Sequence, residues 1–154
     1  MSMHSPQTRF LQACLLLASL ALTGCATNAH KIRFASPSDR DVTIAYGQPY
    51  KGGPSNGICY AVQVGDPIRA SAEGEVQFAR RVGFVGEIII LKHEPPMRTI
   101  YTGSMTMNVG EGARVTKGQI IATIAEPPAD RDREFCFEIR KDIDPIDPQQ
   151  WLAK

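Results

Sequence analysis

Glu134-Phe135-Cys136-Phe137-Glu138 is the stretch of sequence from which the fold can be worked out. Successive side chains of a β-strand point to opposite faces, so the strict alternation of this stretch predicts a strand. The two phenylalanines would lie on one face, and the cysteine with the two glutamates on the other. Such a strand buries its aromatic face and presents a thiol between two carboxylates, either on an outer surface or along a groove.

Short apolar segments separated by glycine-containing turns follow one another through the chain before this strand. Glu87–Lys92 contains four consecutive apolar residues, which is typical of a strand covered on both faces. Met97–Thr102 returns after a turn at Glu94-Pro95-Pro96, so we expect the two strands to pair at the centre of a sheet. No stretch of this region has a helical period. The sequence therefore predicts an all-β fold, a domain of antiparallel β-sheet.

The first 25 residues have the features of an export signal. Arg9 precedes an apolar run, Phe10–Leu22, that is too short to span a bilayer as a stable helix. Leu22-Thr23-Gly24-Cys25 resembles the lipobox of bacterial lipoproteins, in which the cysteine is lipidated and becomes the first residue of the mature chain. The alternative is that Cys25 is an ordinary residue after a small-residue cleavage site. We expect lipidation at Cys25, which gives durable membrane attachment without a spanning helix.

Two further features bear on location and domain limits. Ala26 follows the cysteine where an Asp would favour the inner membrane, which resembles lipoproteins retained in the outer membrane, facing the periplasm. We divide the chain into a signal peptide at residues 1–24, a lipidated tether with a first strand at 25–50, and a domain at 51–154. Within the domain, Lys51–Gly57 concentrates turn formers and is expected to form a loop, and Trp151 is expected to close one end of the core.

Composition and charge limit the classes of function. The 154 residues suffice for one domain, and a chain that is 43% apolar and 21% charged is typical of a globular protein. Cleavage before Cys25 would remove one of the 17 basic residues and none of the 16 acidic ones. The mature chain would then have no net charge, and it has no basic run, so we expect no nucleic-acid partner.

Nine short motifs occur in a fixed order and carry a resemblance to a known family. They are Gly57-Ile58, Gly65–Ala70, Gly74–Val76, Ile89–His93, Thr99–Tyr101, Val109-Gly110, Val115–Ala122, Phe137–Arg140 and Pro145–Pro148. In this order they resemble the LytM or lysostaphin-type peptidoglycan metalloendopeptidase domain over roughly residues 50 to 153. The Lys117 motif alone also occurs in biotinyl and lipoyl carriers, but the flanking pattern of those carriers is missing. The resemblance implies a LytM-like core similar to a barrel-sandwich hybrid.

The resemblance also implies where a metal site would lie. Family enzymes hold zinc with the His and Asp of a His-x-Gly-x-Asp segment and with the second His of a His-x-His strand, while two further histidines assist the attacking water. A catalytic zinc needs three protein ligands and an open position for water. None of the five family residues is retained, so we expect a degenerate domain with no catalytic residue, no zinc and no cofactor. The corresponding positions here are Ser55, Cys59, Gly103, Glu134 and Cys136.

Two of these positions are cysteines, and in the family they converge on one ion. We therefore expect Cys59 and Cys136 to be neighbours and hypothesise a disulfide between them, because an exported chain meets an oxidising compartment. The alternatives are two adjacent reduced thiols and a residual metal site formed by both cysteines with Glu134.

Inactive members of the family are known as activators of cell-wall amidases, which use the vacated groove as a docking surface. We expect this chain to be a non-catalytic envelope lipoprotein whose groove, lined by the five substituted positions, binds a cell-wall amidase, another envelope protein or peptidoglycan itself. A divergent metal-dependent peptidoglycan endopeptidase and a structural component of an envelope assembly are the alternatives.

Overall fold

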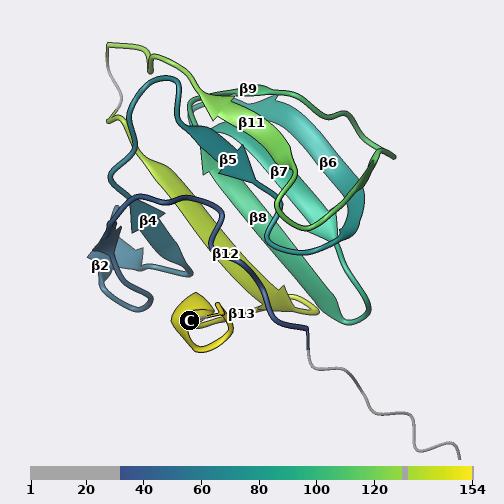
Figure 1. The fold of residues 1–154 in the computed structure, drawn as a ribbon. Coiled ribbons are helices and arrows are strands. Elements are labelled where there is room, and N and C mark those ends of the chain that lie inside the picture. Colours follow the sequence, from purple (N-terminus) through teal and green to yellow (C-terminus); the bar gives the residue numbers. More distant parts are fainter. Residues whose placement is uncertain (1–31, 130–131, 154) are drawn as a thin grey trace, which may run out of the picture. The chain divides into compact units, whose positions relative to one another are not determined.

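The structure is a computed structural model that describes residues 32–129 and 132–153. In these residues the strands form three antiparallel sheets and there is no α-helix (Figure 1). The all-β prediction is therefore confirmed. The expected signal peptide and Cys25 lie outside the described residues. None of the helical structure in the described ranges is long and apolar enough to cross a membrane.

The large sheet has the strand order β1-β4-β12-β8-β7-β6-β10, and β13 pairs with β12. β7 and β8 are neighbours in the middle of this order, as the sequence predicts. Ile89 and Leu91 of β7 are fully buried, whereas Ile88 and Ile90 on its other face are only half-buried. The strand is thus covered fully on one face only. The strands are β1 (Val42–Ile44), β4 (Ile58–Tyr60), β6 (Gly74–Val82), β7 (Gly86–Lys92), β8 (Met97–Gly103), β10 (Arg114–Val115), β12 (Phe135–Lys141) and β13 (Asp144–Ile146).

A second, three-stranded sheet lies over one face of the large sheet (Figure 1). It has the order β5-β11-β9, with β5 at Pro67–Arg69, β11 at Ile120–Ile124 and β9 at Met105–Met107. Apolar side chains from both sheets form one hydrophobic core, which explains why the large sheet has one fully covered face. Its fully buried members include Ile58, Ile68, Ile89, Leu91, Tyr101, Ile121, Phe135, Phe137 and Ile139.

β12 has the alternating burial that its sequence predicts. Phe135, Phe137 and Ile139 are fully buried, and Cys136 and Glu138 between them are half-buried. The strand runs antiparallel to β8 on one side and, through its first three residues, to β4 on the other. Its aromatic face therefore holds the strand to the core, and its opposite face remains available to a site.

The chain before β1 also packs on the domain. Phe34 is fully buried, forms a parallel bridge with Leu152, and donates its backbone N–H to the Trp151 carbonyl oxygen at 3.3 Å. Trp151 packs half-buried against the core, and a 3-10 helix, η1 (Pro148–Gln150), precedes it. Residues 25–50 are expected to be a tether that becomes a first strand, and β1 lies within them. From Phe34 onward the segment is fixed to the core, because this aromatic side chain is fully buried.

The segment interpreted as a loop at Lys51–Gly57 contains a small hairpin. β2 (Pro49–Tyr50) pairs with β3 (Gly53–Pro54), and Lys51 and Gly52 form the turn with φ values of 46° and 90°. Two successive positive φ values are typical of a type I′ turn, which matches the twist of the strands that it connects. This hairpin brings Tyr50 and Lys51 to the first residues of β12.

Candidate functional site

A pocket of about 280 Å³ opens between the β2–β3 hairpin, the end of β8, the start of β12 and the turn between β6 and β7. We call it the site pocket. Ten residues line it: Tyr50, Lys51, Phe84, Val85, Thr102, Gly103, Ser104, Asp132, Glu134 and Cys136. Three of the five groove residues expected from the sequence are among them.

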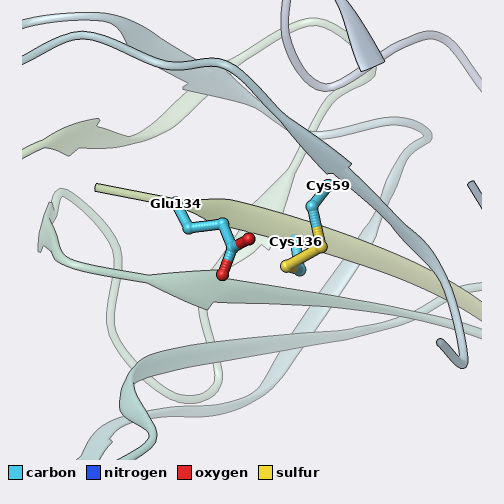
Figure 2. Close-up of side chains that lie close together, drawn as sticks. All are labelled: Cys59, Glu134 and Cys136. Atoms are coloured by element: carbon cyan, nitrogen blue, oxygen red, sulfur yellow. A yellow bond between two sulfur atoms is a disulfide. The ribbon is translucent and has the colours of Figure 1, made fainter. Parts of the chain in front are cut away.

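A disulfide bond joins Cys59 of β4 to Cys136 of β12. The two residues are direct partners in the antiparallel register, with Cα atoms 4.0 Å apart (Figure 2). Cys59 is 1% exposed, whereas Cys136 is half-buried and lines the site pocket. The pocket therefore reaches the disulfide from the Cys136 side.

The carboxylate of Glu134 lies beside this disulfide (Figure 2). The hydroxyl of Tyr50 donates a hydrogen bond to Glu134 Oε2, and the Lys51 ammonium lies 3.0 Å from the same oxygen. The Tyr50 hydroxyl is also 3.6 Å from Cys136 Sγ. The hairpin thus places a phenol and a cation over the carboxylate and the disulfide.

Both hairpin side chains keep their protons at neutral pH. Burial raises the pKa of Tyr50, and its hydrogen bond to Glu134 raises it further. Burial acts to lower the pKa of Lys51, but hydrogen bonds with Tyr50 and Glu134 outweigh it and raise that pKa. Tyr50 is therefore a neutral hydrogen-bond donor and Lys51 a cation.

Ser55 and Gly103 present no functional group to the pocket. The Ser55 side chain is 6% exposed, donates to the Gly57 carbonyl oxygen at 2.8 Å and is not among the lining residues. A Cβ atom added to Gly103 would lie 2.8 Å from the Glu134 carbonyl oxygen, closer than real Cβ contacts allow. A histidine at this position would therefore require the backbone of β8 or β12 to shift.

Sequence reasoning missed the residues that cover and border the site. The sequence analysis places Tyr50 at the end of the segment 25–50 and Lys51 in a loop, and it assigns no role to the turn between β6 and β7. That turn carries Phe84, which is 93% exposed, and Val85, which is 56% exposed. Two apolar residues between Gly83 and Gly86 were the available signal, because turns of this kind normally carry polar residues.

The residues at the expected zinc position do not fit that metal while the disulfide is formed. One ligand atom each from Cys59, Glu134 and Cys136 lies within 4.8 Å of the others. Disulfide sulfurs are not thiolates, however, and the thiolate is the form of cysteine that binds metal. This leaves the Glu134 carboxylate, which is already paired, where a catalytic zinc needs three ligands.

His93 does not complete this set. It is the one histidine among the described residues, and its side chain is buried in another part of the large sheet. Its Nδ1 atom lies 2.6 Å from the Glu73 carbonyl oxygen, and its Nε2 atom lies 2.7 Å from Thr99 Oγ1. Its ring nitrogens are therefore used within the fold.

Comparison with known proteins places this geometry in context. The model of the family described as Peptidase family M23 matches residues 53–148. The chain is 35% identical over 104 residues to the lipoprotein NlpD/LppB homolog of Pseudomonas aeruginosa, a match that covers 67% of this chain and 35% of that protein. It is 26% identical over 98 residues to the murein hydrolase activator EnvC of Escherichia coli, covering 64% of this chain and 23% of EnvC. The chain thus spans about a third or less of these relatives.

Among solved structures, the catalytic domain of the antimicrobial peptidase lysostaphin from Staphylococcus simulans has a TM-score of 0.65 with this chain. The two are 22% identical, and the match covers 75% of this chain and 93% of that domain. At this identity the likeness concerns the fold, an all-β domain of the lysostaphin type.

Proposed function

We propose, because the chain belongs to peptidase family M23, that it is a non-catalytic cell-envelope protein whose site pocket binds a partner and regulates a peptidoglycan amidase. One observation carries this proposal. Where family enzymes would hold zinc, this chain has a disulfide and a carboxylate that is already bound by a tyrosine and a lysine. While the disulfide is formed, such a site does not activate water and instead offers a surface to a partner.

The surroundings of the pocket favour a protein as the partner. Phe84 and Val85 stand exposed at its border, and large exposed apolar side chains next to a hollow are typical of docking sites. Asp132 and Lys51 supply charged groups of both signs at the same border. A relative that is named a murein hydrolase activator, EnvC, supports the choice of a cell-wall hydrolase as the partner.

Release of dye from labelled peptidoglycan tests this proposal. A purified cell-wall amidase is assayed with and without the full chain, and the chain is also assayed alone with added zinc. We expect the chain to raise amidase activity at least about fivefold and to release no dye alone. Zinc-dependent dye release by the chain alone would contradict a non-catalytic role.

Paired variants locate the binding surface. Replacing Phe84 and Val85 with serine should abolish stimulation of the amidase. Ile143→Ser is the matched control, because Ile143 is 78% exposed but lies on the turn between β12 and β13, outside the pocket lining. If the Phe84/Val85 variant and Ile143→Ser lose amidase stimulation equally, or if neither loses it, the site pocket is not the docking surface.

Attachment to the outer membrane through Cys25 is part of the same proposal. The similarity to a Pseudomonas lipoprotein supports it, together with the lipobox-like sequence at Leu22–Cys25. Cys25→Ala should move the protein from the membrane fraction to the soluble fraction of the cell envelope. Unchanged membrane association of this variant would argue against lipidation at Cys25.

A divergent metal-dependent endopeptidase is the second candidate, and one observation favours it. Cys59, Glu134 and Cys136 present ligand atoms close enough to share an ion once the cysteines are reduced. Release of muropeptides by the reduced chain with zinc, but not by the oxidised chain, would favour this candidate.

A further inference from the structure

The geometry points to a metal site that is controlled by the redox state of the Cys59–Cys136 disulfide. We infer that reduction of this bond releases two thiolates which, together with the Glu134 carboxylate, bind one zinc-like divalent cation. The inference concerns metal binding and is independent of amidase regulation.

The backbone already brings the three ligands together. Cys59 and Cys136 are register partners on β4 and β12, and Glu134 precedes Cys136 by two residues, on the same face of the chain. Because β12 is hydrogen-bonded to β4 and also to β8, breaking the S–S bond leaves the two strands paired. The ligand atoms, which lie within 4.8 Å of one another, therefore stay close after reduction.

The donor set suits zinc. Two thiolates and a carboxylate are all established zinc ligands, and three protein ligands leave one position open. Magnesium and calcium are disfavoured, because they select oxygen donors and avoid thiolates. The cation expected here is therefore a borderline or soft divalent ion, of which zinc is the obvious representative.

A dithiol reductant has a route to the bond through the site pocket. Cys136 lines the pocket and Cys59 does not, so access favours attack on Cys136 Sγ. A thiolate of the dithiol forms a mixed disulfide with Cys136, and Cys59 leaves as a thiolate. The second thiol of the reductant then displaces Cys136, and the reductant becomes a cyclic disulfide. Two electrons pass from the dithiol to the protein, and its two protons pass to the new thiolates or to water.

The β2–β3 hairpin affects both the reduction of the disulfide and the binding of the cation. The Lys51 ammonium contacts Glu134, and the Tyr50 hydroxyl lies 3.6 Å from Cys136 Sγ, so the hairpin borders both the bond that is reduced and the carboxylate that would bind the ion. The same two groups occupy Glu134, so a cation must displace them from the carboxylate. Lys51 has a side chain that is 63% exposed and is free to turn toward solvent.

Metal titration of one preparation in two redox states tests the inference. The full chain is purified oxidised in detergent, and half of it is treated with dithiothreitol, which is then removed under argon. Zn²⁺ affinity is measured by competition with a chromophoric chelator, and Co²⁺ serves as a spectroscopic probe. We expect the reduced chain to bind one ion at least about 100-fold more tightly than the oxidised chain, with thiolate-to-cobalt absorption in the near ultraviolet. Equal affinities in the two states would overturn the inference.

Variants assign the ligands and remove the contribution of other cysteines. A Cys59→Ser, Cys136→Ser double variant, which keeps Cys14 and Cys25, should lose the tight site after reduction. Glu134→Gln should weaken Zn²⁺ binding at least about tenfold. Glu138→Gln is the matched control, because Glu138 lies on the same strand face but its carboxylate is held by Arg140 at 2.7 Å.

A measurement of secondary structure shows whether the reduced chain used in the metal titration is still folded. Circular dichroism of the reduced, metal-free chain should retain the β-sheet spectrum of the oxidised chain, because neither cysteine belongs to the hydrophobic core cluster. If the reduced chain is unfolded, or if Glu134→Gln and Glu138→Gln lower affinity equally, the preformed site inferred here does not exist.

Discussion

The hydroxyl of Tyr50 donates a hydrogen bond to the Glu134 carboxylate, across 84 positions of sequence. Lys51 contacts the same carboxylate oxygen, and the Tyr50 hydroxyl also lies next to Cys136 Sγ. Two adjacent residues of one short hairpin therefore fix the hairpin to the first residues of β12. This contact determines what the site pocket offers to a partner and what a metal ion must displace.

Tyr50→Phe removes this hydrogen bond and leaves the ring in place. We expect the oxidised variant to lose about 1 kcal/mol of unfolding free energy, because the bond is charge-assisted and half-buried. After reduction, the variant should bind Zn²⁺ several-fold more tightly than the wild type, since Glu134 has one competitor fewer. Urea unfolding and chelator competition measure the two effects.

The control for this variant is Tyr46→Phe. The Tyr46 hydroxyl donates to the Pro145 carbonyl oxygen at 3.1 Å, an exposed contact away from Glu134. The same chemical change there should leave Zn²⁺ affinity unchanged. If Tyr50→Phe and Tyr46→Phe change Zn²⁺ affinity by the same factor, the Tyr50–Glu134 contact has no specific effect on metal binding.

Gly57 is required by close packing against β12. A Cβ atom at this position would lie 2.2 Å from the Phe137 carbonyl oxygen, which is backbone and unable to move aside. We expect Gly57→Ala to cost at least about 2 kcal/mol of unfolding free energy, measured by urea denaturation. Gly53→Ala, in the same segment, meets no atom within 4 Å and should change stability by less than about 0.5 kcal/mol. Similar losses at both glycines would contradict this account.

The regular part of the fold was predictable from local patterns. Alternation fixed the faces of β12, and glycine-bounded apolar segments located β7 and β8. Both signals are short-range, since a strand repeats every two residues and a turn needs a residue that tolerates its backbone angles. The β2–β3 hairpin was not predictable in this way, because prolines and glycines dominate its sequence and only two residue pairs form its ladder.

The composition of the site was predictable only in part. Family resemblance assigned Cys59 and Cys136 to positions that converge in space, and in the structure they are register partners. Resemblance gives no information on residues outside the shared motifs, so the roles of Tyr50 and Lys51 depended on tertiary structure. It also does not reveal the direction of a side chain. Ser55 occupies an assigned ligand position, yet its hydroxyl is used inside a buried turn.

The Cys59–Cys136 bond should contribute strongly to stability. It closes a loop with a sequence separation of 77, for which loss of chain entropy in the unfolded state corresponds to about 4 kcal/mol. We expect reduction, or the double replacement by alanine, to lower the urea midpoint by the corresponding amount. The alanine variant should not respond to reductant, which separates the effect of this bond from those of other thiols. An unchanged midpoint on reduction of the wild type would contradict this expectation.

His93 should make the domain less stable in mild acid. Burial lowers its pKa more than the hydrogen bond with the Glu73 carbonyl raises it, so the folded chain binds a proton less readily than the unfolded chain. The contribution of neutral His93 is therefore complete above the unfolded pKa of about 6.5 and is lost as the pH falls toward the folded pKa. The slope from this one group is at most about 1.4 kcal/mol per pH unit.

Urea unfolding of the wild type and of His93→Gln between pH 7.5 and pH 5 measures this contribution. The variant should be less stable at pH 7.5, because it disturbs the contacts with Glu73 and Thr99, but its stability should change less with pH. Other titratable groups beside the ring are common to both proteins and do not distinguish them. They are Glu73, Glu75, Lys92, Glu94 and Arg114.

Two acids elsewhere in the domain titrate below the pH range of this experiment, because hydrogen bonds from Arg40 and Arg80 lower the pKa values of Asp66 and Glu111. Parallel pH profiles for the two proteins would assign the acid sensitivity to groups other than His93.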